Sequence, residues 1–361
     1  MKKLITIGFA VLTSAFTFAQ IPSGYYNSAE GLTGYELKTR LSQIITNGHQ
    51  DRGYGNLMDI AYRVGDLDKY YENNNTILDI YSERPNGPDA YEYVPGVKEC
   101  GNYNAESICY NREHIFPQGF FNEAAPMRND YHHVLPTDGY VNGRRSNFPF
   151  GKVANATWTS TNGSKVGSSA NAGYNGTVFE PIDEFKGDVA RILLYFVTRY
   201  QSRLGNFSPN NTNNPLDGST GRSFEQWQVD VLLAWHALDP VSPKEIDRNN
   251  YAYTYQGNRN PYIDHPEYVT MIWSSSTLSA QDSELKNTLK ISQNPVKNGE
   301  IIVEGKDIAQ IETAQIISMT GQMIQEVKNP FKNSNRLVLK NKTKGNYILK
   351  LDNQTLKFIV Q

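Results

Sequence analysis

Apolar residues repeat every three to four positions in two segments of the chain, and this spacing predicts amphipathic helices. The first segment contains Leu37, Leu41, Ile44 and Ile45, and the second contains Val189, Ile192, Leu193 and Phe196. Two further helices are predicted to start at capping boxes, formed by Ser223 with Gln226 and by Ser242 with Glu245. With a strand predicted at residues 76–81, these helices indicate an α+β domain.

Polar segments divide the chain into smaller parts. Two runs rich in Asn, Ser, Thr and Gly, residues 153–176 and 206–222, predict long surface loops in a body that covers residues 20–273. Residues 274–288 predict a linker to a C-terminal module at residues 289–361. Short apolar runs in this module predict a small all-β sandwich, with strands at residues 300–303, 315–318, 337–339, 347–351 and 357–360.

The two predicted parts differ in charge, which the average over the chain conceals. The 361 residues contain 35 Lys and Arg against 37 Asp and Glu, a formal net charge of -2. The module holds 11 basic and 6 acidic residues, a net charge of +5, whereas residues 20–288 hold 22 and 31, a net charge of -9. The body therefore lacks a general basic field, and binding to a nucleic acid would require local phosphate contacts or a metal ion.

The first residues have the order of a secretory signal peptide. Lys2 and Lys3 precede an apolar run, residues 4–12, and small residues then lead to Ala19, which predicts a signal peptide at residues 1–19. A membrane anchor is the alternative, but the run is shorter than the ~20 apolar residues that span a bilayer. We therefore expect export to the periplasm, followed by secretion or display on the cell surface.

Cys100 and Cys109 are the two cysteines of the chain. In an exported protein, two cysteines this close in sequence favour a disulfide that closes the loop of residues 101–108. Metal binding by this pair alone is the alternative, but zinc sites normally have four ligands.

A carboxylate and an imidazole are adjacent at Glu113 and His114. In an extended strand they would point to opposite faces, so they could serve one site only if the strand bends or ends there, and a proline three residues later favours an end. A second cluster contains Asp130, His132 and His133. We expect these three to support the neighbouring structure through hydrogen bonds, and a zinc cluster is the alternative.

Asn142 and Arg145 lie three positions apart, and Ser146 directly follows Arg145. If Thr137 or Asp138 caps a helix, all three side chains fall on one helical face. An amide oxygen and a guanidinium would then point to the same place, which combines a ligand for a hard cation with a clamp for phosphate.

These segments resemble the endonuclease I family of secreted and periplasmic nucleases. The resemblance rests on Arg-Glu-His at residues 112–114, Asp-x-His-His at residues 130–133 and Val-Asn-Gly-x-Arg-Ser-Asn at residues 141–147, and matching motifs continue over roughly residues 35–273. That family has the His-Me finger, or ββα-metal, active site. The resemblance thus implies a nuclease domain of mixed helices and a small sheet.

The same resemblance implies roles for individual residues. His114 matches the general base that activates water, and Glu113 and Asn142 match ligands of a single Mg²⁺ ion, with Mn²⁺ or Ca²⁺ as alternative metals. Arg145 and Arg144 are the candidates for binding the scissile phosphate.

The C-terminal module has a resemblance of its own. Residues 294–296, 319–322 and 344–347 resemble the type A sorting domain of the type IX secretion system. This implies the type IX secretion machinery as a partner. The module contains neither His nor Cys, so we expect no catalysis there.

The sequence therefore predicts a secreted endonuclease that hydrolyses phosphodiester bonds in DNA and RNA with little sequence specificity. An inactive nuclease-fold protein that binds at the cell surface is one alternative, and a zinc phosphoesterase is another. The joint presence of Glu113, His114 and Asn142 argues against the inactive protein, because a degenerate site would have lost at least one of them.

Overall fold

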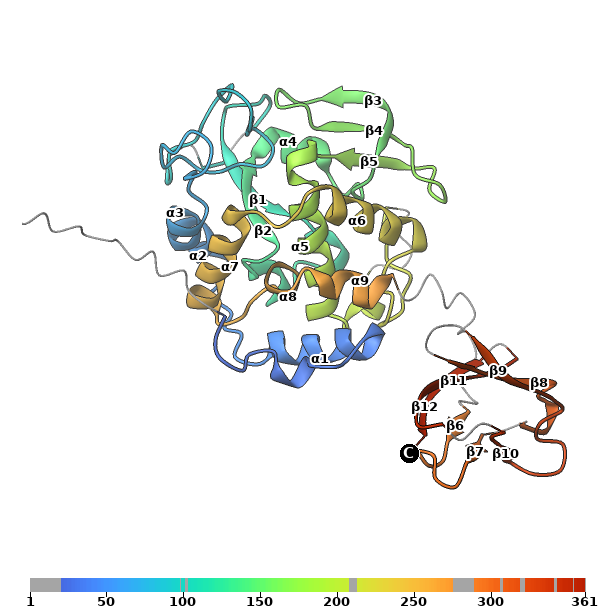
Figure 1. Cartoon of the computed structure of the whole chain (residues 1–361). Coiled ribbons are helices and arrows are strands. Elements are labelled where there is room, and N and C mark those ends of the chain that lie inside the picture. Colours follow the sequence, from blue (N-terminus) through green and yellow to red (C-terminus); the bar gives the residue numbers. More distant parts are fainter. Residues whose placement is uncertain are drawn as a thin grey trace, which may run out of the picture. The chain divides into compact units, whose positions relative to one another are not determined.

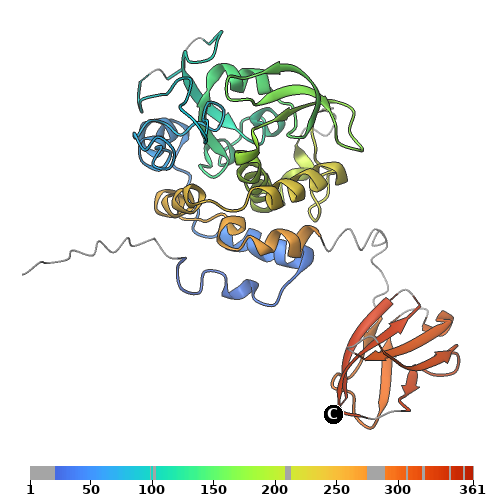
Figure 2. The same cartoon turned by 45° about the horizontal axis from the view of Figure 1, so that its top comes forward.

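The computed structural model describes residues 21–97, 99–100, 103–207, 213–274, 289–305, 308–318, 322–340, 343–352 and 354–360. Contacts divide the chain into two compact units, Met1–Leu278 and Ser279–Gln361 (Figure 1, Figure 2). The predicted signal peptide and residues 275–288 of the predicted linker lie outside the described residues. No helix in the described part of the chain is both long and apolar enough to cross a membrane.

The first unit is built around one buried helix, α5 (Lys186–Arg199), in which every residue as far as Thr198 is buried. Helices α1 (Gly34–Thr46), α6 (Gln226–Leu238) and α8 (Pro261–Asp264) pack against it (Figure 1). The predicted helical repeats account for this packing, because Leu37, Leu41 and Ile45 are buried on one face of α1. Other helices are α2 (Tyr54–Asn56), α3 (Tyr62–Gly65), α4 (Gly139–Arg145), α7 (Pro243–Gln256) and α9 (Glu267–Trp273). Short 3-10 segments lie at Asn27–Ala29, Gln118–Phe121, Met127–Asn129, Asp183–Phe185 and Leu204–Asn206, and a π-helical turn lies at Leu57–Ala61.

Two small antiparallel sheets belong to the same unit. One pairs β1 (Tyr110–His114) with β2 (Val134–Asp138), and the other has the order β3 (Val153–Thr159), β4 (Lys165–Ser169), β5 (Thr177–Glu180). The prediction of a surface loop at residues 153–176 is therefore wrong. Most residues of β3 are exposed, and two of the residues that alternate with its Asn and Thr side chains are small alanines, so the apolar alternation is too weak to reveal the strand.

The strand predicted at residues 76–81 is also wrong. Ile77 makes only an isolated bridge with Leu67. The Asp79 carboxylate accepts a hydrogen bond of 2.8 Å from the main-chain N–H of Tyr81, which turns the chain at this point.

The two predicted capping boxes have different outcomes. Ser242 and Glu245 form a capping box at the start of α7, as predicted. Ser223 does not cap α6, which begins after Glu225. Its hydroxyl instead accepts a hydrogen bond of 2.8 Å from Lys38, a partner 185 residues away that no local pattern reveals.

The second unit contains two antiparallel sheets around one apolar core. One has the strand order β10-β7-β6 and the other the order β12-β11-β8-β9. Buried residues of both sheets, among them Val303, Ile316, Leu349 and Phe358, belong to this core. The strands are β6 (Lys290–Ile291), β7 (Glu300–Glu304), β8 (Thr313–Ser318), β9 (Met323–Lys328), β10 (Arg336–Val338), β11 (Gly345–Leu351) and β12 (Gln354–Val360), and a 3-10 segment lies at Ile308–Gln310. The sequence predicted five of these strands and missed β6 and β9.

Candidate active site

The site is carried by two antiparallel strands and the short helix that follows them. β1 pairs with β2 so that Glu113 lies opposite Leu135 and His114 lies opposite Val134. β2 then leads directly into α4, whose N-cap is Asp138. One carboxylate oxygen of Asp138 accepts the N–H groups of Tyr140 and Val141, each at 2.8 Å.

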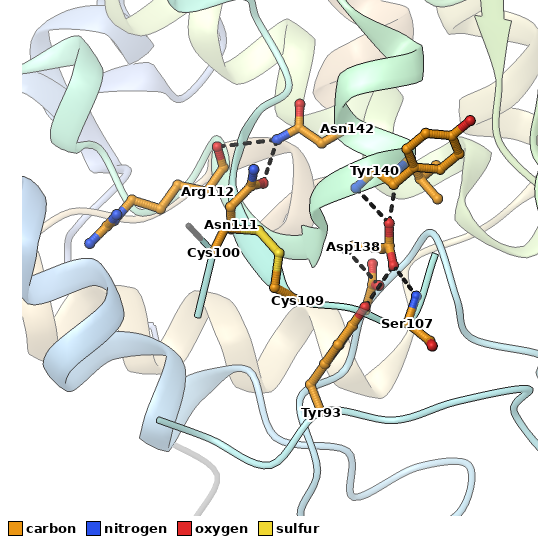
Figure 3. Close-up of a disulfide and its surroundings, with 11 residues drawn as sticks. Tyr93, Cys100, Ser107, Cys109, Asn111, Arg112, Asp138, Tyr140 and Asn142 are labelled. Atoms are coloured by element: carbon orange, nitrogen blue, oxygen red, sulfur yellow. Dashed lines mark hydrogen bonds between the residues drawn. A yellow bond between two sulfur atoms is a disulfide. The ribbon is translucent and has the colours of Figure 1, made fainter. Parts of the chain in front are cut away.

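The predicted disulfide between Cys100 and Cys109 is confirmed, and it lies beside the start of α4 (Figure 3). Cys109 precedes β1, and its main-chain oxygen accepts a hydrogen bond of 2.8 Å from Gly139 N. A Cβ atom at position 139 would clash with the Cys100 sulfur, so this position requires glycine. The disulfide therefore fixes the described part of the loop, residues 103–108, against the first turn of α4.

His114 is the last residue of β1, and its side chain is only 4% exposed. Its Nε2 atom lies 3.0 Å from the main-chain oxygen of Arg128, which can only accept, so Nε2 carries the hydrogen and Nδ1 keeps its lone pair. Burial, followed by the neighbouring His133, lowers the pKa of His114 to about 3. The imidazole is therefore neutral at physiological pH and has the form of a base.

The Glu113 carboxylate is held in place by two side chains. Its Oε1 atom accepts a hydrogen bond of 2.8 Å from the Tyr81 hydroxyl and lies 3.4 Å from a guanidinium nitrogen of Arg145. Burial raises the pKa of Glu113, and both partners oppose this effect. Because these contacts involve Oε1, the second carboxylate oxygen is the one that can bind a ligand.

The Asn142 side chain is oriented by its own amide group. Its Nδ2 atom donates to Asn111 Oδ1 at 2.7 Å and to the main-chain oxygen of Arg112 at 3.4 Å (Figure 3). This leaves the amide oxygen as the atom that can coordinate a cation.

Glu113, His114 and Asn142 line one polar pocket of about 240 Å³. β1 ends at His114, so the adjacent carboxylate and imidazole reach the same pocket. The carboxylate and amide oxygens form a donor set that suits a hard cation such as Mg²⁺. The structure thus brings together the three residues to which the sequence assigned the central chemistry.

The two predicted phosphate-binding arginines lie in different environments. Arg145 is 2% exposed and donates to the main-chain oxygens of His114 and Ile115 at 2.9 and 2.6 Å. Arg144 is exposed, with its guanidinium 5.3 Å from the centre of the Trp158 ring. The Arg145 guanidinium is thus engaged by the protein, and its contact with a phosphate stays a prediction.

Sequence reasoning did not assign a role to Tyr54 or Arg112, although both line the pocket. The guanidinium groups of Arg112 and Arg128 lie 4.3 and 4.1 Å from the centre of the Tyr54 ring. The Tyr54 ring in turn stacks on His114, with ring centres 6.0 Å apart. Arg112 could have been noticed from its position beside Glu113, whereas nothing local identifies Tyr54.

Asp130 anchors the segment between β1 and β2 to the helical core. It is completely buried, and its carboxylate accepts hydrogen bonds from the Tyr195 and Tyr200 hydroxyls at 2.9 and 2.8 Å and from the Gln256 amide at 2.7 Å. Burial alone would raise its pKa, but the neighbouring histidines hold it well below its usual range.

The two neighbouring histidines face main-chain oxygens. His132 Nε2 lies 3.1 Å from the oxygen of Asn258, and His133 Nε2 lies 2.5 Å from the oxygen of Met127. Within the described residues, Asp130, His132 and His133 do not form a group of converging metal ligands. This geometry suits a supporting role for all three.

Comparison with known proteins places this site in a family. The family model for Endonuclease I matches residues 33–267. An extracellular ribonuclease of Bacillus amyloliquefaciens is 34% identical over 253 residues, which cover 69% of this chain and 78% of that protein. An extracellular ribonuclease of Bacillus subtilis is 32% identical, with the same coverage of both chains. An Endonuclease-1 of Buchnera aphidicola is 27% identical over 38% of this chain and 46% of its own length. The chain belongs to the endonuclease I family, and it is a nuclease that acts on phosphodiester bonds.

Proposed function

We propose that the chain is an exported, Mg²⁺-dependent endonuclease of the His-Me finger type that hydrolyses DNA and RNA with little sequence specificity. Two relatives are named extracellular ribonucleases, which supports export and RNA as a substrate, and another is named Endonuclease-1, which supports internal cleavage.

The geometry around β1 supports a one-base mechanism. His114 Nδ1 would take a proton from a water molecule that attacks the phosphorus, because the bond to Arg128 leaves this nitrogen unprotonated. Glu113 and Asn142 both line the pocket and would hold the cation through the side-chain oxygens that the contacts described above leave available. A bound Mg²⁺ would stabilise the negative charge that develops on the phosphate and on the leaving 3′ oxygen.

Arg112 is better placed than Arg145 to contact the substrate phosphate. Both side chains line the pocket, but Arg112 is partly exposed and stacks on Tyr54, whereas Arg145 is buried and donates to main-chain oxygens. Arg145 would act indirectly, by holding Glu113 and the end of β1.

The observation that carries this proposal is the convergence of Glu113, a base-form His114 and Asn142 on one polar pocket. The test is incubation of the purified protein with supercoiled plasmid and with structured RNA, in Mg²⁺ or in chelator. We expect internal cleavage of both substrates, with 5′-phosphate ends, only when Mg²⁺ is present. Cleavage that persists in chelator would refute the metal-dependent mechanism, and cleavage of RNA alone would refute the broad substrate range.

For the C-terminal unit we propose a role as a sorting domain for the type IX secretion system. The unit has its own apolar core and a net charge opposite to that of the nuclease body. Some of the motif residues, including Met319 and Thr320, lie outside the described part of the chain. Deletion of residues 289–361 should retain active nuclease in the periplasm, and normal secretion of the shortened protein would refute this role.

A further inference from the structure

Three carboxylates converge in the segment that precedes β1. One carboxylate oxygen from each of Asp68, Glu72 and Glu83 lies within 4.8 Å of the other two. None of the three belongs to an ion pair with Lys or Arg within the described residues. Three negative charges this close repel one another unless a cation or a proton lies between them.

Glu83 supplies a second and independent observation. Its side chain is only 1% exposed, and its Oε1 atom is buried without a hydrogen-bond partner. Buried polar atoms in folded proteins almost always have a hydrogen-bond partner. An unpaired carboxylate oxygen in a cluster of acids therefore indicates a bound ligand that the protein chain does not supply. Burial, followed by Asp89, Glu72 and Asp68, raises the pKa of Glu83 to about 9.

Asp68 is fixed in position by the main chain around it. Its two carboxylate oxygens accept N–H groups from Tyr70, Tyr71, Glu72 and Asn73 at 2.9 to 3.1 Å. Glu72 is partly exposed, which gives a route from solvent to the other two carboxylates. The cluster therefore has two buried acids, of which Asp68 is held by the main chain, and one partly exposed acid.

We propose that Asp68, Glu72 and Glu83 bind one structural Ca²⁺ ion at a site separate from the nuclease centre. The available donors are all carboxylate oxygens on an irregular loop, which suits the larger and less demanding coordination shell of Ca²⁺ better than the strict octahedron of Mg²⁺. Water molecules would complete the shell on the exposed side of Glu72.

Such an ion would stiffen the support of the nuclease pocket without touching the substrate. The chain between Glu72 and Glu83 contains Asp79, which accepts the main-chain N–H of Asp138 at 2.8 Å, and Tyr81, which donates to Glu113. Tying the two ends of this segment together would restrict the motion of both contacts.

The test is thermal unfolding of the full-length protein after removal of metal, with increasing CaCl₂ in a constant excess of MgCl₂. A ligand that binds only the folded state at 100 times its dissociation constant should raise the unfolding temperature by on the order of 5 °C. Glu83→Gln and Glu72→Gln should each abolish this rise.

Two control variants separate this site from the nuclease centre. Asn142→Ala, which removes a ligand of the proposed nuclease metal, should keep the full Ca²⁺-dependent rise, as should Glu30→Gln at an exposed position. Calorimetric titration of Asn142→Ala with Ca²⁺ should still give one site per chain. The inference is overturned if the wild type shows no rise, since Glu83 is then simply protonated, or if the rise survives in both Glu72→Gln and Glu83→Gln.

Discussion

The imidazole of His114 donates to the main-chain oxygen of Arg128, and this contact links the end of β1 to the segment that leads into β2. A main-chain acceptor fixes the tautomer without adding a charge, unlike a carboxylate partner. Because the acceptor belongs to the backbone, substitution of the Arg128 side chain leaves the tautomer of His114 unchanged.

Replacement of His114 by alanine should remove the general base. We expect kcat to fall by about 10² to 10⁴-fold, the usual contribution of a positioned base, while the affinity for DNA changes little. The loss of a buried ring should also lower the unfolding temperature, so activity is compared at a temperature at which both proteins are folded. Plasmid cleavage under single-turnover conditions measures the effect. His265→Ala, at a partly exposed histidine that pairs with Glu267, serves as the control, and an active His114→Ala enzyme would eliminate the assignment of the base.

Tyr81→Phe should weaken metal binding more than it weakens the fold. Loss of the hydrogen bond to Glu113 should lower the free energy of unfolding by about 1 kcal/mol and raise the Mg²⁺ concentration for half-maximal activity by about tenfold. Tyr91→Phe removes a comparable bond to Glu106, away from the pocket. It should cost similar stability with an unchanged Mg²⁺ dependence, and an equal shift in both variants would argue against a positioning role for Tyr81.

Arg112→Ala should reduce the affinity for nucleic acid and decrease the slope of log affinity against log salt by about 1, as expected for the loss of one phosphate contact. Arg144→Ala changes the charge equally at an exposed position beside Trp158 and should have a smaller effect. Filter binding in Ca²⁺ over a range of salt concentrations distinguishes the two. The reverse order of effects would assign the phosphate contact to Arg144.

Removal of the disulfide by the double substitution Cys100→Ser and Cys109→Ser should lower the free energy of unfolding by about 2 to 3 kcal/mol, the value expected for a short closed loop. KM should rise, because Tyr103 in this loop lines the pocket. Urea unfolding and steady-state kinetics measure the two effects. Reductant should reproduce both changes in the wild type and have no effect on the double variant.

Lys38 should make stability depend on pH. Burial lowers the pKa of Lys38 from 10.5 to about 7, although Asp217 opposes the shift. Between these values the unfolded chain holds a proton that the folded chain has lost, so the free energy of unfolding should rise with pH by a few kcal/mol across this window. Lys38→Met should flatten this slope in urea titrations from pH 7 to 9.5, whereas Lys152→Met, at an exposed position, should leave it unchanged.

Local sequence signals predicted those parts of the structure that depend on neighbours in the chain. The repeat that includes Leu37 and Leu41, the capping box at Ser242 and the cysteine pair all act over fewer than ten residues. The candidate site residues Glu113, His114 and Asn142 were singled out from their chemistry and spacing, their roles came from the family resemblance, and the structure brings them to one pocket.

The remaining contacts join distant segments, and no local pattern could reveal them. Tyr81 reaches Glu113 across 32 positions, and Lys38 reaches Ser223 across 185. The burial of Arg145 was missed for the same reason, because its partners, the main-chain oxygens of His114 and Ile115 and the carboxylate of Glu113, lie 30 to 32 positions away.

The anchoring of Asp130 has a consequence for protein engineering. The Asp130 carboxylate accepts hydrogen bonds from two tyrosines of the α5 region and from Gln256 at the end of α7. The surrounding helices therefore hold the strands and the helix of the site in position. A peptide of residues 110–145 alone would therefore not form an active nuclease site when it is grafted onto another protein. A screen for inactive variants should instead recover substitutions at Tyr195 and Tyr200, which are buried and do not line the pocket.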